Sequence, residues 1–298
     1  MRSSEWPLIF FTLMIQMSAG FFVILSILHV PIFAENEIIV LREILCKLPL
    51  VICLIIALAL AISFFHLGNP KNALYVLTNI SSSWLSREIL LTIVFSIFAF
   101  TASFIIYMNF FPFVFEQLIL ALTAISGIAL VYSMSRLYML KTVPTWNSNY
   151  TMISFYLSAA TLGLFSLLTI LIYFLKQSGI SIGQLKAQEG LANFILAVCF
   201  ILIASELVLG ILQFKSLRKE ASSTRNKFNL IVQRHRYLIM FRFILGIIIL
   251  FLIFIIIAMQ SKTIVEVSHL IYISFTLMIV SEFCGRYLFY EMYASIGI

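Results

Sequence analysis

Residues 238–259 have the sequence LIMFRFILGIIILFLIFIIIAM, in which Arg242 is the one charged side chain. An α-helix rises 1.5 Å per residue, so a run of this length extends roughly 33 Å, about the thickness of the hydrocarbon core of a bilayer. The run therefore predicts a helix that crosses a membrane.

Seven further apolar runs of similar length predict seven further spans, near 8–30, 44–66, 88–110, 115–138, 150–175, 191–213 and 265–290. Proline and glycine residues mark the breaks between them, as is typical of helix ends and turns. Lipid offers no partners for backbone N–H and C=O groups, so helices are the expected spanning element. We predict an all-α, polytopic membrane helix bundle of about eight transmembrane helices, forming a single integral membrane domain over residues 1–298. The first run, which starts at Pro7, is too long for a signal-peptide core, and we expect it to be retained.

The composition excludes a soluble fold. The chain is 62% hydrophobic and 10% charged, and its 12 acidic residues are all glutamates, whereas soluble domains carry about 25% charged residues. The net charge of +7 does not indicate a nucleic-acid partner, because seven of the 19 basic residues are concentrated between Lys215 and Arg236. A basic loop between two spans, beside anionic lipid headgroups, accounts for this concentration.

An even number of spans places both termini on one side of the membrane. Thirteen Lys and Arg residues then fall on the side of the termini and five on the other side, which holds Arg42, Lys47, Lys176, Lys186 and Lys262. The positive-inside rule predicts cytoplasmic termini from this difference.

No metal site is expected. The four cysteines lie in separate apolar runs without the spacing of a zinc or iron–sulfur site, so they are interpreted as buried thiols. A haem held by two histidines would need imidazoles at matching depth. The pair His29 and His269 is the one alternative to a chain without haem.

The most informative polar stretch follows the second run. It contains HLGNP at 66–70 and SWLSRE at 83–88, and the segment between them is predicted to lie along the interface as a short helix or loop. The His66 imidazole can hydrogen-bond a quinone carbonyl or accept a proton from a quinol, and the Glu88 carboxylate can take a second proton. The structural alternatives are a boundary histidine bonded to backbone and a first-turn glutamate favoured by the helix dipole and paired with Lys or Arg.

Other polar residues near the membrane faces or inside the runs extend this hypothesis. Arg136, Tyr138, Trp146 and Asn147 fall on the same face as His66, where they could line a quinol entrance or contact a partner; an interfacial aromatic anchor is the alternative for Trp146. Glu206 and Glu282 lie inside apolar runs, where an unpaired charge is costly. They are interpreted either as a proton path or cavity wall, or as interhelical hydrogen-bonding groups, with an Arg286–Glu282 contact at i, i+4 as a structural option.

The chain resembles the membrane-anchor subunit of bacterial dimethyl sulfoxide reductase. The central motif is HLGNP followed by SWLSRE. Further matches occur in the same order, at 5–8 (EWPL), Gln16 and Gly20, 138–140 (YML), 144–147 (PTWN), 281–282 (SE) and 285–290 (GRYLFY).

The resemblance implies a subunit of the bacterial inner membrane that oxidises menaquinol without haem or a terminal-substrate active site of its own. Electrons would pass to an iron–sulfur subunit and then to a molybdopterin catalytic subunit. His66 and Glu88 correspond to residues associated with the quinol site in that family. From their position near the same membrane face, we expect Trp84, Arg87, Arg136 and Trp146 as further contacts of the quinol.

Two rival functions remain open at this point. One is the anchor of a related polysulfide or tetrathionate reductase, since the partner subunit determines the terminal substrate. The other is a multi-helix transporter or receptor. A transporter would be expected to show inverted repeats and broken helices, of which the Ser-Glu pairs at 205–206 and 281–282 are the only trace.

Overall fold

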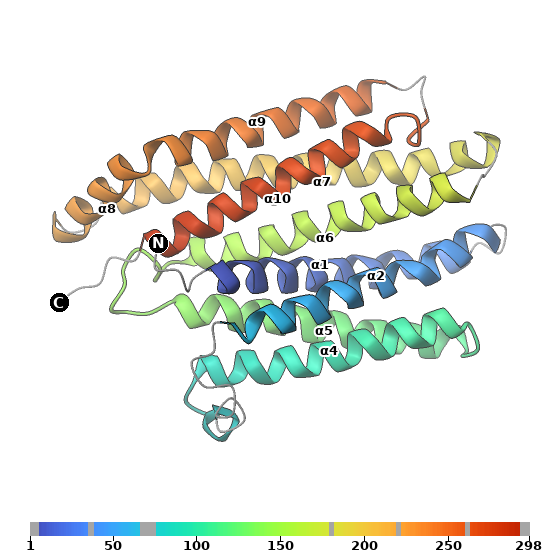
Figure 1. Cartoon of the computed structure of the whole chain (residues 1–298), viewed down its shortest axis with the longest axis horizontal. Coiled ribbons are helices and arrows are strands. Elements are labelled where there is room, and N and C mark those ends of the chain that lie inside the picture. The colour runs from blue at the N-terminus through green and yellow to red at the C-terminus, as the bar shows by residue number, and fades with distance from the viewer. Residues whose placement is uncertain are drawn as a thin grey trace.

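The computed structural model describes residues 6–34, 39–65, 76–178, 182–218, 222–259 and 263–292. Every regular element in these ranges is a helix, which confirms the predicted fold class (Figure 1). The elements are α1 (Trp6–Ala34), α2 (Ile39–Ser63), the 3-10 helix η2 (Leu77–Asn79), α4 (Trp84–Met108), α5 (Phe113–Tyr138), α6 (Asn149–Gln177), α7 (Ile182–Leu217), α8 (Ser222–Arg234), α9 (Arg236–Ala258) and α10 (Ser268–Glu291).

Eight helices within the described ranges are long and apolar enough to cross a membrane, and each coincides with a predicted run. The chain is therefore a multi-pass membrane protein. Four helices extend at least four residues beyond the predicted runs. α1 continues through Pro31 to Ala34, α2 begins at Ile39, α4 begins at Trp84, and α7 begins at Ile182 rather than near residue 191. A proline removes one backbone hydrogen bond, and membrane helices tolerate that loss where neighbouring groups replace it.

The two most buried spans are α1 and α6, which lie at the centre of the bundle (Figure 1). The α4–α5 hairpin packs on one flank, and α7 and α9 form the other. Within the most apolar 18-residue window, 72% of α1 and of α6 is buried, against 22% of α7 and 28% of α9. The flank formed by α7 and α9 therefore presents most of its apolar surface to lipid.

The crossing of α1 and α6 requires two glycines, Gly20 and Gly163. A Cβ on Gly20 would overlap the carbonyl of Ala159, and a Cβ on Gly163 would overlap the backbone of Gly20 and Phe21. Small residues at such crossings let helix backbones approach closely, which is a main source of packing energy in lipid. This contact fixes the two central helices against each other.

The turn between α4 and α5 is as short as predicted. Asn109 ends α4 in the left-handed conformation with φ of 50°, and Pro112 precedes the first residue of α5. Asparagine tolerates positive φ better than most residues, and proline suits a helix start because its missing N–H needs no partner there.

The basic stretch from Lys215 to Arg236 was predicted to be a loop, and this prediction is wrong. Most of this stretch is helical, because α7 continues to Leu217 and α8 follows it. The reason is the apolar side of α8: Phe228 is fully buried against Leu217, Leu288 and Met292.

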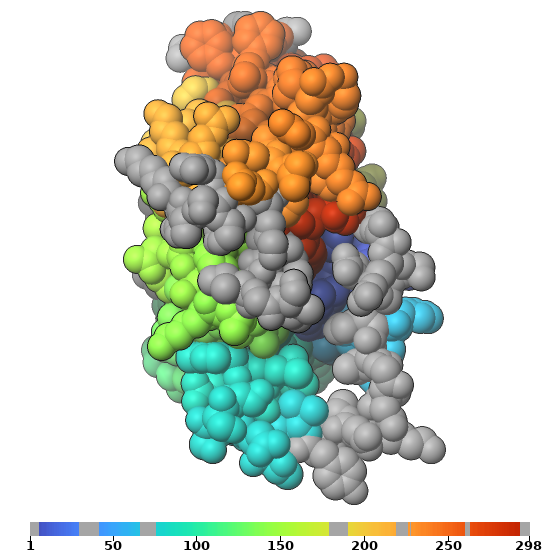
Figure 2. Space-filling model, turned by 90° about the vertical axis from the view of Figure 1, so that its left-hand side faces the viewer, coloured from blue at the N-terminus to red at the C-terminus, as the bar shows by residue number. Residues whose placement is uncertain are grey.

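α1 begins and α10 ends at the same end of the bundle, here called the terminus-bearing end (Figure 1). Figure 2 looks onto this end, where the start of α4 (cyan), the segment before α6 (light green) and α8 (orange) spread across the surface. The even number of spans accounts for this arrangement. The predicted site residues that the structure describes also lie here.

Candidate functional site

Glu88 lies in the second turn of α4, one turn deeper than expected. α4 begins at Trp84 because the Ser83 side chain caps it and accepts a hydrogen bond from the Ser86 N–H at 3.3 Å. Glu88 is only 6% exposed, and its Oε2 is buried without a hydrogen-bond partner in the described part of the chain. No ion pair to Glu88 occurs among these residues either, so the structure offers no support for the interpretation as a first-turn carboxylate paired with Lys or Arg.

Two tyrosines, the buried Tyr138 and the partly buried Tyr290, lie at the same end of the bundle as Glu88. The hydroxyls of Tyr138, the last residue of α5, and Tyr290 on α10 are 2.9 Å apart. Glu88 interacts electrostatically with both phenols, although its Oε2 has no hydrogen bond to either hydroxyl. A carboxyl group and two hydroxyls from three helices therefore share one buried region at the terminus-bearing end.

Trp84, Arg87 and Arg136 form a cationic and aromatic cluster beside this region. The guanidinium carbon of Arg87 lies 4.3 Å from the Trp84 ring centroid, and that of Arg136 lies 5.4 Å from it. Such contacts are attractive because the face of the indole ring carries negative charge density. The structure thus brings together three of the predicted contacts.

Arg87 also fixes the segment before α4. Its Nε donates to the Ile80 carbonyl at 2.8 Å and its Nη2 to the Ser81 carbonyl at 2.7 Å. The Ser86 hydroxyl donates to the Val76 carbonyl at 2.6 Å. The described part of the predicted interfacial segment includes the 3-10 helix η2, and these bonds hold it against α4.

Trp146 lies outside the Trp84 cluster, in a buried aromatic group. Its Nε1 donates to the Phe289 carbonyl at 2.7 Å, and its ring stacks on Phe289 with centroids 5.3 Å apart. The Tyr138 ring meets Trp146 edge-on at 5.5 Å, which connects this group to the tyrosine pair. Trp146 thus packs the segment before α6 against the end of α10. The neighbouring Asn147 is exposed.

His66 lies outside the described residues. Phe65 immediately precedes it and stacks on Trp6 at the start of α1, with ring centroids 6.4 Å apart. The end of α2 and the start of α1 therefore lie side by side at the terminus-bearing end.

Arg286 does not form the i, i+4 ion pair with Glu282 that was one structural option. Its Nη2 donates a 2.7 Å hydrogen bond to Gln16 Oε1, and its guanidinium carbon lies 3.8 Å from the centroid of the Phe155 ring. Gln16 is fully buried in α1. The sequence signal for this contact was Gln16 itself, because a glutamine inside an apolar run needs a polar partner from another helix.

A second polar cluster lies at the opposite end of the bundle and was not predicted. His29 Nδ1 is 3.0 Å from Gln117 Oε1, and its Nε2 is 3.4 Å from Glu116 Oε2. His29 and Glu116 are each 1% exposed, so the cluster joins α1 to α5 inside the protein. His269, considered with His29 as a haem pair, is exposed.

The described residues contain no group of three or more His, Cys, Asp or Glu side chains that could hold a metal ion. Cys46, Cys53, Cys199 and Cys284 are free and buried, as predicted.

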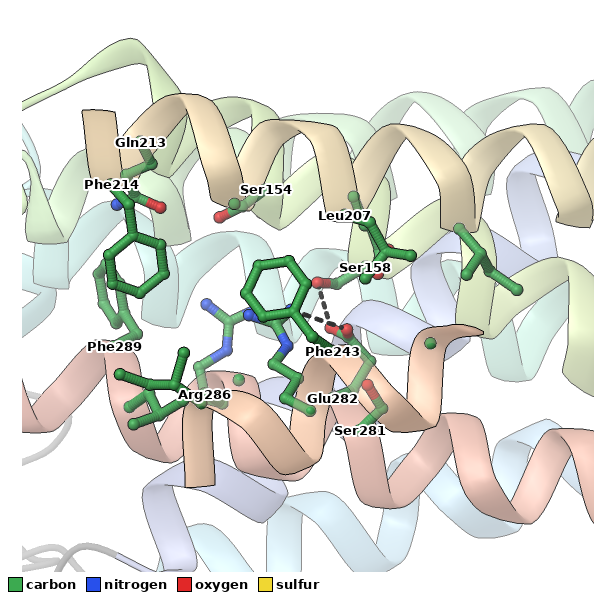
Figure 3. Close-up of a pocket in the computed structure, with 18 of the residues that line it drawn as sticks. Ser154, Ser158, Leu207, Gln213, Phe214, Phe243, Ser281, Glu282, Arg286 and Phe289 are labelled. Atoms are coloured by element: carbon green, nitrogen blue, oxygen red, sulfur yellow. Dashed lines mark hydrogen bonds and ion pairs between the residues drawn. The ribbon is translucent and has the colours of Figure 1, made fainter. Parts of the chain in front are cut away.

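A pocket lined by described residues lies between α6, α7, α9 and α10 (Figure 3). Glu282 Oε1 is 3.3 Å from Arg242 Nη2, and Glu282 Oε2 accepts a short hydrogen bond from Ser158. Thr161 on α6 donates to Glu206 on α7 at 2.9 Å, which confirms the interhelical hydrogen bond proposed for Glu206. Glu206 and Glu282 thus border one cavity, which agrees with their interpretation as part of a cavity wall.

Comparison with known proteins identifies the family. The model of the family described as DMSO reductase anchor subunit (DmsC) matches residues 1–292. The chain belongs to this family. The anchor family accounts for the whole chain, which favours this role over the transporter and receptor alternatives. The protein is therefore the anchor subunit of a DMSO reductase complex, an oxidoreductase system, and it has partner subunits.

Curated relatives agree with this assignment. The C subunit of the anaerobic dimethyl sulfoxide reductase of Haemophilus influenzae is 28% identical over 294 residues, covering 99% of this protein and 96% of the relative. The corresponding C subunit of Escherichia coli is 28% identical over 298 residues with the same coverage. The YnfH subunit of an E. coli anaerobic dimethyl sulfoxide reductase is 28% identical over 159 residues, 53% of this protein and 55% of the relative. No solved structure matches the protein.

Proposed function

We propose that this anchor oxidises menaquinol at the terminus-bearing end of the bundle. The electrons then pass to an iron–sulfur subunit and onward to a molybdopterin subunit. The observation that carries the proposal is Glu88, a carboxyl group that is 6% exposed, has one oxygen without a hydrogen-bond partner among the described residues, and lies at the same end of the bundle as the Tyr138–Tyr290 pair. A buried polar atom without a partner is rare in proteins and favours a functional role.

The residues fit the chemistry of quinol oxidation. A quinol that becomes a quinone releases two electrons and two protons. In the proposed reaction the imidazole of His66 accepts one proton and the carboxylate of Glu88 accepts the other, while the electrons leave to the iron–sulfur subunit. The cluster of Trp84, Arg87 and Arg136 suits the edge of a quinone ring, because guanidinium groups donate hydrogen bonds to carbonyl oxygens.

The anchor role predicts a dependence that can be measured in the purified complex. With this subunit present, an iron–sulfur protein and a molybdoenzyme should co-purify, and the complex should oxidise a reduced naphthoquinol. Without it, the soluble subunits should keep turnover with an artificial electron donor and lose turnover with the quinol. Equal quinol oxidation with and without this subunit would refute the proposed function.

The proposed location is the bacterial inner membrane with both termini in the cytoplasm. The charge difference of thirteen basic residues against five supports this orientation. Reporter domains fused after Ile298 and inserted between α7 and α8 should both be active as cytoplasmic reporters. Activity of periplasmic reporters at both positions would place the terminus-bearing end, with Glu88, on the periplasmic face.

A further inference from the structure

The cavity between α6, α7, α9 and α10 extends along these helices from the terminus-bearing end. Its volume is about 90 Å³, and its lining on α10 extends from Met292, just beyond the helix, to Met278. Gln213 near the end of α7 and Ile239 near the start of α9 line it at the same end. Fourteen residues of helix correspond to about 21 Å. In a bilayer core about 30 Å thick, the cavity therefore reaches from the terminus-bearing end to the middle of the membrane.

Four charged side chains line the cavity, two of each sign. Glu206 and Glu282 carry carboxyl groups, and Arg242 and Arg286 carry guanidinium groups. The lining is neutral when all four are ionised, so it favours neither a cation nor an anion as an occupant. Arg242 Nη2 lies 3.3 Å from Glu282 Oε1. An ion pair away from bulk water is stable only where further hydrogen bonds satisfy its remaining polar atoms. A neutral polar molecule is therefore the expected occupant.

Arg286 independently indicates a hydrogen-bond acceptor in the cavity. It is 5% exposed and lines the cavity, and its Nε is buried without a partner among the described residues. Its Nη2 already donates to Gln16. Figure 3 shows the Arg286 side chain projecting from α10 among the lining residues, beside Glu282. A guanidinium group can only donate hydrogen bonds, so the remaining nitrogen needs an acceptor that the described protein atoms do not supply.

Water and a lipid acyl chain are the two neutral occupants that a membrane offers. An acyl chain makes no hydrogen bond, so it would leave Arg286 Nε without an acceptor and the carboxyl groups without solvation. Water both accepts and donates hydrogen bonds. One water requires about 10–15 Å³, so a cavity of about 90 Å³ has room for several. Ser154 and Gln213 line its outer part and offer further polar partners.

We propose that the cavity is a water-binding site that extends the aqueous phase from the terminus-bearing end to the middle of the membrane. Its waters accept a hydrogen bond from Arg286 Nε and donate to the carboxylates of Glu206 and Glu282. They keep four charged side chains hydrated at a depth where lipid would not. This site goes beyond the proposed oxidation of quinol and does not depend on it.

Radiolytic footprinting of the wild-type protein in nanodiscs tests for the water directly. Hydroxyl radicals formed from a water beside a methionine sulfur convert it to the sulfoxide, which mass spectrometry detects. Met278 lines the cavity and is 1% exposed, whereas Met134 on α5 is 0% exposed and does not line it. Met278 should therefore be oxidised several-fold faster than Met134. Equal rates at the two equally buried methionines would overturn the proposal.

Filling the cavity should remove this difference. Gly210 on α7 lines the cavity, and a Cβ there would meet only the Phe243 ring, at 3.4 Å, so the position accepts a side chain. Gly210→Leu should lower the oxidation of Met278 to the rate of Met134. Gly190→Leu is the matched control on the same helix, because a Cβ at Gly190 meets nothing within 4 Å and the residue does not line the cavity. Oxidation of Met278 that is unchanged in Gly210→Leu would contradict water in this cavity. The wild-type comparison decides the same question if this variant fails to fold.

The entry side is tested by rapid mixing with water that contains ¹⁸O before irradiation. In the wild type the label should appear in the Met278 sulfoxide within the mixing time. Gln213→Trp places a bulky side chain at the outer end of the cavity and should delay the label. Leu212→Trp is the matched control, since Leu212 is 44% exposed and does not line the cavity. Equally fast labelling in both variants would overturn entry from the terminus-bearing end.

Discussion

Glu88→Gln is expected to lower quinol-dependent turnover of the assembled complex by about 100-fold or more. Glutamine keeps the shape of the side chain but cannot accept the proton, and general base catalysis typically contributes about 10²–10⁴-fold. Turnover with an artificial donor that reduces the soluble subunits directly should persist. The measurement compares the two donors in the same purified variant, so a loss of assembly would be visible as a loss of both activities.

Two companion variants sharpen this test. His66→Ala should give the same phenotype, with an assembled complex, abolished quinol turnover and retained artificial-donor activity. Glu43→Gln is the control for the substitution itself and should behave as wild type with both donors. Normal quinol oxidation in either Glu88→Gln or His66→Ala would show that the proposed proton acceptors are assigned wrongly.

Gly163→Ala is expected to destabilise the protein by about 3 kcal/mol, the upper end of the usual range for overpacking. The added methyl group would overlap the backbone of Gly20 and Phe21 on α1. Backbone atoms cannot move aside as a side chain can, so α1 and α6 would have to separate. Thermal unfolding in detergent, followed by tryptophan fluorescence, should show a clearly lower midpoint and a lower yield of folded protein.

Gly190→Ala provides the matched control on α7. A Cβ at Gly190 meets nothing within 4 Å, so this substitution should leave the midpoint unchanged or raise it slightly through helix propensity. Equal midpoints for the Gly163 and Gly190 variants would contradict the tight crossing of the two central helices.

The spans were predictable because lipid imposes one simple requirement on each of them. A run such as 238–259 must be helical and must have a minimum length, and neither property depends on the rest of the fold. The course of the polypeptide between spans is less constrained. α8 shows this, since its helix depends on Phe228 finding a buried place against the ends of α7 and α10.

The candidate site was predictable only as a set of residues at one end of the bundle. The sequence places Trp84, Arg87 and Arg136 at the same membrane face, and the structure brings them into contact. Which groups meet inside the bundle depends on how each helix is rotated about its axis, and a single sequence does not give that rotation. The sequence therefore did not show that the ion-pair partner of Glu282 is Arg242 on α9 rather than Arg286 on α10.

The last turn of α10 is held by the segment before α6. The Thr145 hydroxyl donates to the Met292 carbonyl at 2.6 Å, and the Trp146 indole donates to the Phe289 carbonyl. The last carbonyls of a helix have no partner within the helix itself, so these two bonds prevent the end of α10 from fraying. Residues 289–292 therefore hold the segment before α6 as much as that segment holds them, and their removal would leave the hydroxyl of Thr145 and the indole of Trp146 without these acceptors.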